Sequence, residues 1–103
     1  MALPRSVTVL GDKIRVLQVD AKTMKYEAQD DTAIGLALLL ENKILILKNL
    51  PEKEKPRVLT HEIVHFILYK TCSNVSISAE MEEVLCQVIA TTFGQMDLRF
   101  KKR

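Results

Sequence analysis

Two histidines four residues apart, His61 and His65, enclose the sequence His-Glu-Ile-Val-His. On an α-helix, residues at this spacing project from one face and lie about one turn, roughly 6 Å, apart. Two imidazoles at that separation can bind the same zinc ion. Glu62 is rotated by about 100° around the helix axis, so it flanks the metal and can take a proton from a zinc-bound water. The spacing therefore predicts a hydrolytic zinc site with Glu62 as its general base.

The residues around this motif are almost all apolar, which predicts a helix that is buried on most sides. They are Val58, Leu59, Ile63, Val64, Phe66, Ile67 and Leu68. Burying two imidazoles and a carboxylate among them without partners would cost on the order of several kcal/mol. A metal ion beside an access cleft supplies such partners. We therefore interpret His61 and His65 as metal ligands rather than as core histidines bonded to neighbouring backbone.

A hydrolytic zinc site has a third protein ligand and one open position for water. The sequence has only two histidines, so the third ligand must be a carboxylate or a thiolate. The last expected helix begins near Ser78, a typical N-cap residue, and carries Glu80, Glu82 and Glu83. Glu82 flanks the apolar stripe of that helix and is the preferred ligand, with Glu83 and Glu80 as alternatives. Carboxylates that do not bind the metal would form a solvated acidic first turn.

The apolar stripe itself is interpreted as core. It consists of Met81, Val84, Leu85, Val88, Ile89 and Thr92, and Met96 prolongs it. Cys86 lies within the same pattern and is predicted to be a small core residue. Nothing in the spacing of Cys72 favours metal binding. Two cysteines without a secretion signal indicate reduced thiols in a cytoplasm rather than a disulfide framework.

Composition indicates one globular domain over residues 1–103, since 48% of the residues are apolar and the charges are mixed. The formal net charge of +2 is too small to indicate nucleic-acid binding. Lys101-Lys102-Arg103 is accordingly predicted to be a solvated tail. The longest apolar run, 33–40, is too short to span a bilayer. These features predict a cytoplasmic protein that binds neither membrane nor nucleic acid.

The residues before the motif read mainly as strands. Apolar and polar residues partly alternate over 7–10 and 14–19, with Gly11-Asp12 as a turn, which predicts a β-hairpin. The apolar runs 35–40 and 44–47 predict a second hairpin around Asn42, in preference to one helix over 32–50.

The segment 20–32 is polar, lacks either period and is predicted to be a loop. Pro51 and Pro56 fit the first turns of helices, so the motif helix is expected from about Pro56 to Thr71. The expected class is α+β, with two packed helices on a small antiparallel sheet.

The segment Leu59-Thr-His-Glu-Ile-Val-His-Phe-Ile-Leu68, preceded by the hairpin around Asn42 and by Leu50-Pro51, resembles the small phage and prophage zincin-like metallopeptidases, which are distantly similar to the ImmA/IrrE family. The resemblance runs from about Gly35 to Phe93 and includes Glu82-Glu-Val-Leu85. It implies a minimal zincin-like fold of the gluzincin type, with His61, His65 and a helix glutamate as zinc ligands. A phage origin would place the protein in the bacterial host cytoplasm. The chain departs from the ImmA/IrrE pattern in having no Glu-Ala-x-x-Phe-Ala segment.

These observations predict zinc-dependent hydrolysis of a protein or peptide substrate. Tyr69, one turn beyond His65, is a candidate transition-state donor, although a tyrosine with a buried ring and a surface hydroxyl is the commoner arrangement. An edge strand within 35–47 is expected to hold an extended substrate. One alternative is a zinc-stabilised protein-binding module that does not cleave its partner. Another is a nucleic-acid-associated protein that uses the basic tail.

Overall fold

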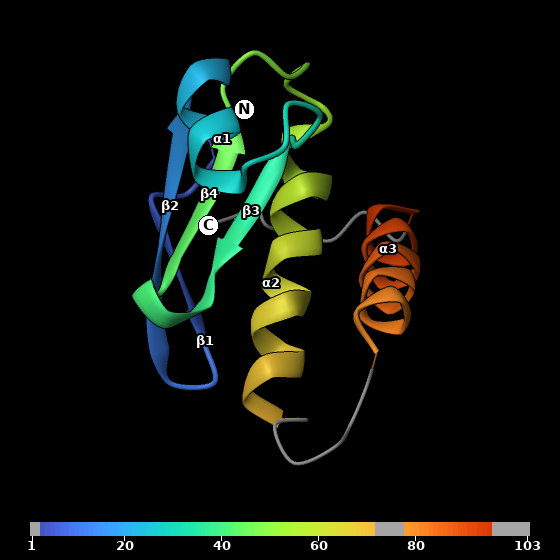
Figure 1. Ribbon diagram of the computed structural model, residues 1–103. Coiled ribbons are helices and arrows are strands. Elements are labelled where there is room, and N and C mark those ends of the chain that lie inside the picture. The colour runs from blue at the N-terminus through green and yellow to red at the C-terminus, as the bar shows by residue number, and fades with distance from the viewer. Residues whose placement is uncertain (1–2, 72–77, 96–103) are drawn as a thin grey trace.

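The computed structural model describes residues 3–71 and 78–95, with 89–95 described by their backbone. A four-stranded sheet packs against helix α2, and α2 in turn lies between the sheet and helix α3 (Figure 1). The strands are β1 (Ser6–Val9), β2 (Asp12–Val19), β3 (Gly35–Leu38) and β4 (Lys43–Leu47). The helices are α1 (Ala21–Ala28), α2 (Lys55–Thr71) and α3 (Ala79–Gln95), and a 3-10 turn, η1 (Leu39–Glu41), precedes β4. The predicted α+β class is confirmed.

The sheet has the strand order β1-β2-β4-β3, so β3 is an edge strand. The pairs β1–β2 and β3–β4 are antiparallel, as the two predicted hairpins require. The central pair β2–β4 is parallel, with Arg15 opposite Lys43 and Val19 opposite Leu47. The expectation of a wholly antiparallel sheet is therefore wrong at its centre. A parallel connection needs a crossover, and here the chain between β2 and β4 contains α1 and β3.

Helix α1 occupies part of the segment predicted to be a loop, so that prediction is wrong. The Asp20 carboxylate accepts a hydrogen bond from the Thr23 backbone N–H at 2.8 Å, which is an N-cap contact. Gln29 ends the helix in the left-handed conformation, with φ of 55°. Met24 is the buried residue of this helix. A capped helix of about two turns thus forms within the segment predicted to be a loop.

The two hairpin turns differ in how closely they match the turns predicted from the sequence. The first turn is centred on Leu10 and Gly11, both with positive φ, rather than on Gly11 and Asp12. At the second, β3 ends at Leu38 and Asn42 adopts φ of 53°, the left-handed conformation expected of it.

Helix α2 covers one face of the sheet and closes the main core. The buried cluster between them consists of Val9, Ile14, Val16, Ile44, Ile46, Val58, Leu59 and Phe66. The start of α2 is fixed by Lys55, which is only 5% exposed. Its Nζ donates to Gln18 Oε1 at 2.8 Å and to Glu52 Oε2 at 2.6 Å. The helix that carries the motif is therefore anchored to β2 at its first residue.

Helix α3 begins after Ser78, whose Oγ accepts a hydrogen bond from the Met81 N–H at 3.1 Å, as the predicted N-cap requires. The predicted burial of its apolar stripe is wrong at Met81, Val84 and Val88, which are 53%, 57% and 57% exposed, whereas Leu85 is half-buried. The helix packs on α2 through a neighbouring face, on which Cys86 is completely buried.

Several predictions concern residues that the structure does not describe. The side chains of Ile89 and Thr92, together with Met96, Cys72 and the tail 101–103, lie outside the described residues. Within the described ranges, no helix is long and apolar enough to cross a membrane.

Candidate metal centre

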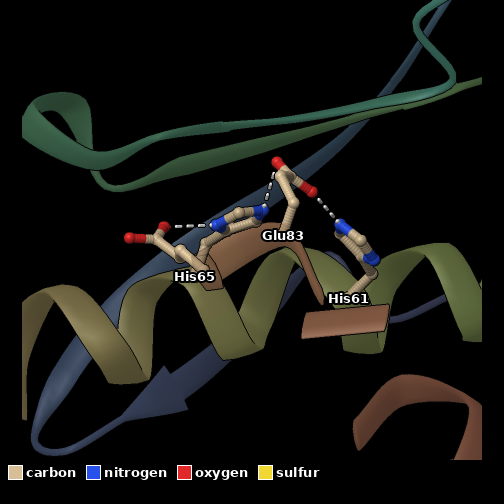
Figure 2. Close-up of polar contacts among 4 residues, drawn as sticks. His61, His65 and Glu83 are labelled. Atoms are coloured by element: carbon tan, nitrogen blue, oxygen red, sulfur yellow. Dashed lines mark hydrogen bonds and ion pairs between the residues drawn. The ribbon is translucent and has the colours of Figure 1, made fainter. Parts of the chain in front are cut away.

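The two motif histidines share one face of α2, as their spacing predicts. The side chains of His61 and His65 are 19% and 13% exposed, and their ring centroids lie 5.1 Å apart. Both rings lie beside the carboxylate of Glu83 from α3 (Figure 2). The α2–α3 contact therefore brings ionisable side chains of two helices to one point.

Glu83 bridges the two histidines. Its Oε1 lies 3.1 Å from Nε2 of His61, and its Oε2 lies 3.2 Å from Nε2 of His65 (Figure 2). Glu82 contacts the opposite side of the second ring, with Oε2 at 2.6 Å from Nδ1 of His65. Glu80 is exposed in the first turn of α3. Glu82 and Glu83 thus both contact the histidines, but at different ring nitrogen atoms.

The carboxyl group of Glu62 is buried next to this cluster, with 7% of the residue exposed. Burial raises its pKa from 4.5 to about 7, an effect that His65 opposes and Glu83 reinforces. A carboxyl group with a pKa near neutrality is well matched to general acid–base chemistry.

Strand β3 passes close to Glu62 because residue 35 has no side chain. A Cβ atom at Gly35 would lie 2.6 Å from Cγ1 of Val58 and 2.8 Å from Oε2 of Glu62. Separations below 3.0 Å force neighbouring atoms to move. The glycine therefore allows the edge strand to approach the buried carboxyl group.

Gly35→Ala should destabilise the protein by about 1–3 kcal/mol, the usual cost of overpacking a core. Urea unfolding would measure this loss. Val58→Ala removes one of the two obstructing groups, so the double variant should lose less stability than the sum of the two single variants. Strict additivity of the two losses would contradict the role given to Val58.

The raised pKa of Glu62 should also make the stability of the metal-free protein depend on pH. Between pH 4.5 and 7 the folded state keeps a proton on Glu62 that the unfolded state releases, so the free energy of unfolding falls as pH rises. The stabilisation is complete below pH 4.5 and is lost as pH passes 7, a change of about 3 kcal/mol for this shift. Urea unfolding from pH 4 to 8 should show this slope in the parent and not in Glu62→Gln. Equal slopes in both proteins would contradict the prediction.

Cys86 and the two histidines together form a group that could hold a metal ion. Each of His61, His65 and Cys86 offers one ligand atom, and these atoms all lie within 4.8 Å of one another. Burial raises the pKa of the Cys86 thiol to about 12, with further contributions from Glu83, Glu82 and Glu62. The sequence holds a signal for this position, because residues three and four apart share a helix face and Cys86 follows Glu83 by three and Glu82 by four.

The cluster opens into a cleft of about 670 Å³. Ile34 lines it together with Gly35, Leu36 and Ala37 of the edge strand β3, and α2 contributes Arg57, Val58 and the motif. Glu83 and Gln87 line it from α3. Tyr69, which is 44% exposed, is not among the described residues that line the cleft.

The donor set suits a transition metal such as zinc, because imidazole, carboxylate and thiolate are its usual protein ligands. Comparisons of the chain with models of known protein families, with curated proteins and with solved structures give no match.

Proposed function

We propose that the protein is a zinc-dependent peptidase of the zincin type. One observation carries this proposal: the two histidines, whose Nε2 atoms share the Glu83 carboxylate, line the same cleft as the buried Glu62. The pKa of Glu62 is raised to about 7. When bound, a zinc ion would activate water and polarise a peptide carbonyl. In this proposal His61 and His65 are metal ligands and Glu62 is the general base, as their spacing predicts.

Glu83 is the carboxylate ligand in this proposal, rather than Glu82. Its two oxygens lie at Nε2 of His61 and Nε2 of His65, so replacing those contacts by a shared cation requires little movement. Glu82 lies at Nδ1 of His65 instead. A carboxylate there orients a metal-binding imidazole and leaves its Nε2 free for the ion.

Glu62 acts as the general base. It takes a proton from the attacking water and delivers it to the amine nitrogen as the peptide C–N bond breaks. Its carboxyl group lies beside Gly35 of the edge strand and lines the same cleft as the histidines, so both transfers can occur within that cleft. Because residue 35 is a glycine, β3 places no side chain against the Glu62 carboxyl group at this position.

The edge strand supports a peptide as the substrate. One side of β3 pairs with β4, and 34–37 line the cleft. An extended peptide can add to such an edge through main-chain hydrogen bonds. The free thiol of Cys86 beside the histidines supports action in a reducing compartment such as the cytoplasm.

A second candidate is a zinc-stabilised binding module without catalysis. The exposed apolar residues Met81, Val84 and Val88 on α3 favour it, because such a face suits contact with another protein. In that case zinc would serve only to join α2 to α3.

Cleavage of a random peptide mixture by the purified protein tests the proposal. Zinc-loaded protein should generate new peptide termini detectable by mass spectrometry, and chelator-treated protein should not until zinc is restored. Stoichiometric zinc without cleavage of any peptide would favour the binding module.

A further inference from the structure

Cys86 differs from Glu83 in its access to the cleft. Cys86 is 0% exposed and is not among the described residues that line the cleft. Glu83 lines the cleft, and its side chain is 61% exposed. The thiol is therefore enclosed near the two imidazoles, whereas the carboxylate that contacts them is open to the cleft.

The separations of the three atoms are close to those of a coordinated set. Nitrogen and sulfur atoms bound to one tetrahedral zinc ion lie roughly 3.3–3.6 Å apart, given usual bond lengths. The ligand atoms of His61, His65 and Cys86 lie within 4.8 Å of one another. Side-chain rotations that move each atom by about 1 Å would bring them to that spacing.

We propose that the Cys86 thiolate is itself a metal ligand, together with His61 and His65, and that Glu83 is the exchangeable fourth ligand. The thiol loses its proton to solvent as the sulfur–metal bond forms. A site with all four protein ligands has no place for substrate, so one ligand must leave first. Glu83 is the one that can leave, because it faces the cleft and Cys86 is enclosed.

This assignment also restricts which metal ions the site would bind. Two imidazoles and a thiolate favour zinc, cobalt(II) or copper(I) over Mg²⁺, Ca²⁺ and Mn²⁺, which prefer oxygen ligands. The inference rests on the metal binding of the proposed function and is independent of whether the protein cleaves peptides.

Titration of the reduced, metal-free full chain with Co²⁺ tests it, because a thiolate ligand gives a sulfur-to-cobalt charge-transfer band in the near ultraviolet. The parent should bind one equivalent of Co²⁺ with this band. The chain has two cysteines, so Cys72→Ala is the matched control and should keep the band. Cys86→Ala should lose it, and its zinc affinity should fall by more than the roughly 10–100-fold that loss of an outer-shell partner costs. Glu83→Gln should keep it.

The outcomes separate this inference from the proposed function. One bound Co²⁺ without the band in the parent would overturn the assignment of Cys86 and leave the metal site standing. Loss of the band in Cys72→Ala would overturn it as well. Failure to bind Co²⁺ or Zn²⁺ at all would overturn both. Should Cys86→Ala not fold, a band that survives in Cys72→Ala still identifies Cys86 as its source.

Discussion

Replacing Glu62 with glutamine should leave zinc binding unchanged and lower the rate of peptide hydrolysis by about 10²–10⁴-fold, the usual contribution of a general base. Glutamine has nearly the same size as glutamate, so it fits the same space beside Gly35. The amide cannot accept the proton that the carboxylate takes from water. Cleavage kinetics on a peptide found in the random mixture, with zinc content measured alongside, would check both halves of this expectation.

The matched control is Glu54→Gln. Glu54 also lines the cleft, but its carboxylate pairs with Arg57 at 3.3 Å instead of lying at the histidines. This variant should hydrolyse peptide at close to the parent rate. A Glu62→Gln protein that retained parent activity would show that another group removes the proton.

Removing the Glu83 carboxylate should weaken zinc binding more than removing that of its neighbour. Glu83→Gln loses a group that lies at Nε2 of both histidines, whereas Glu82→Gln loses a group at Nδ1 of one. Loss of an outer-shell partner typically costs 10–100-fold in metal affinity, so we expect about that loss for Glu82→Gln and a larger one for Glu83→Gln.

Competition with a chromophoric chelator would measure both affinities in the same buffer. The two variants make the same chemical change at adjacent positions of α3, so differences in helix propensity or net charge cannot account for their ranking. A greater loss in Glu82→Gln would reverse the assignment and return the metal to the glutamate that the sequence favours.

The motif could be predicted from sequence because its geometry is local. Four residues of α-helix place His61 and His65 on one face whatever surrounds them, and the structure places them so. The choice among glutamates depended instead on how α3 is rotated against α2. Taking Met81, Val84 and Val88 as the inward face favoured Glu82, but those side chains face solvent.

The same rotation explains why Cys86 was interpreted only as core. Burial was predicted correctly, since its exposure is 0%, but its neighbours come from α2 and cannot be read from its own helix. The parallel pairing of β2 with β4 is also a tertiary property, because strand patterns do not give strand direction. Helix α1 does carry a local signal, since Asp20 followed by a run without glycine or proline is typical of a helix start.

The crossover at the centre of the sheet has a consequence for the order of assembly. Arg15 cannot meet Lys43 until the intervening chain has been made and has turned back, so the sheet forms late relative to its first hairpin. All the described candidate ligands follow the last strand, at positions 61 to 86. During synthesis the sheet thus emerges before any of these donor atoms does, and the ion can be captured only once α2 and α3 have been made.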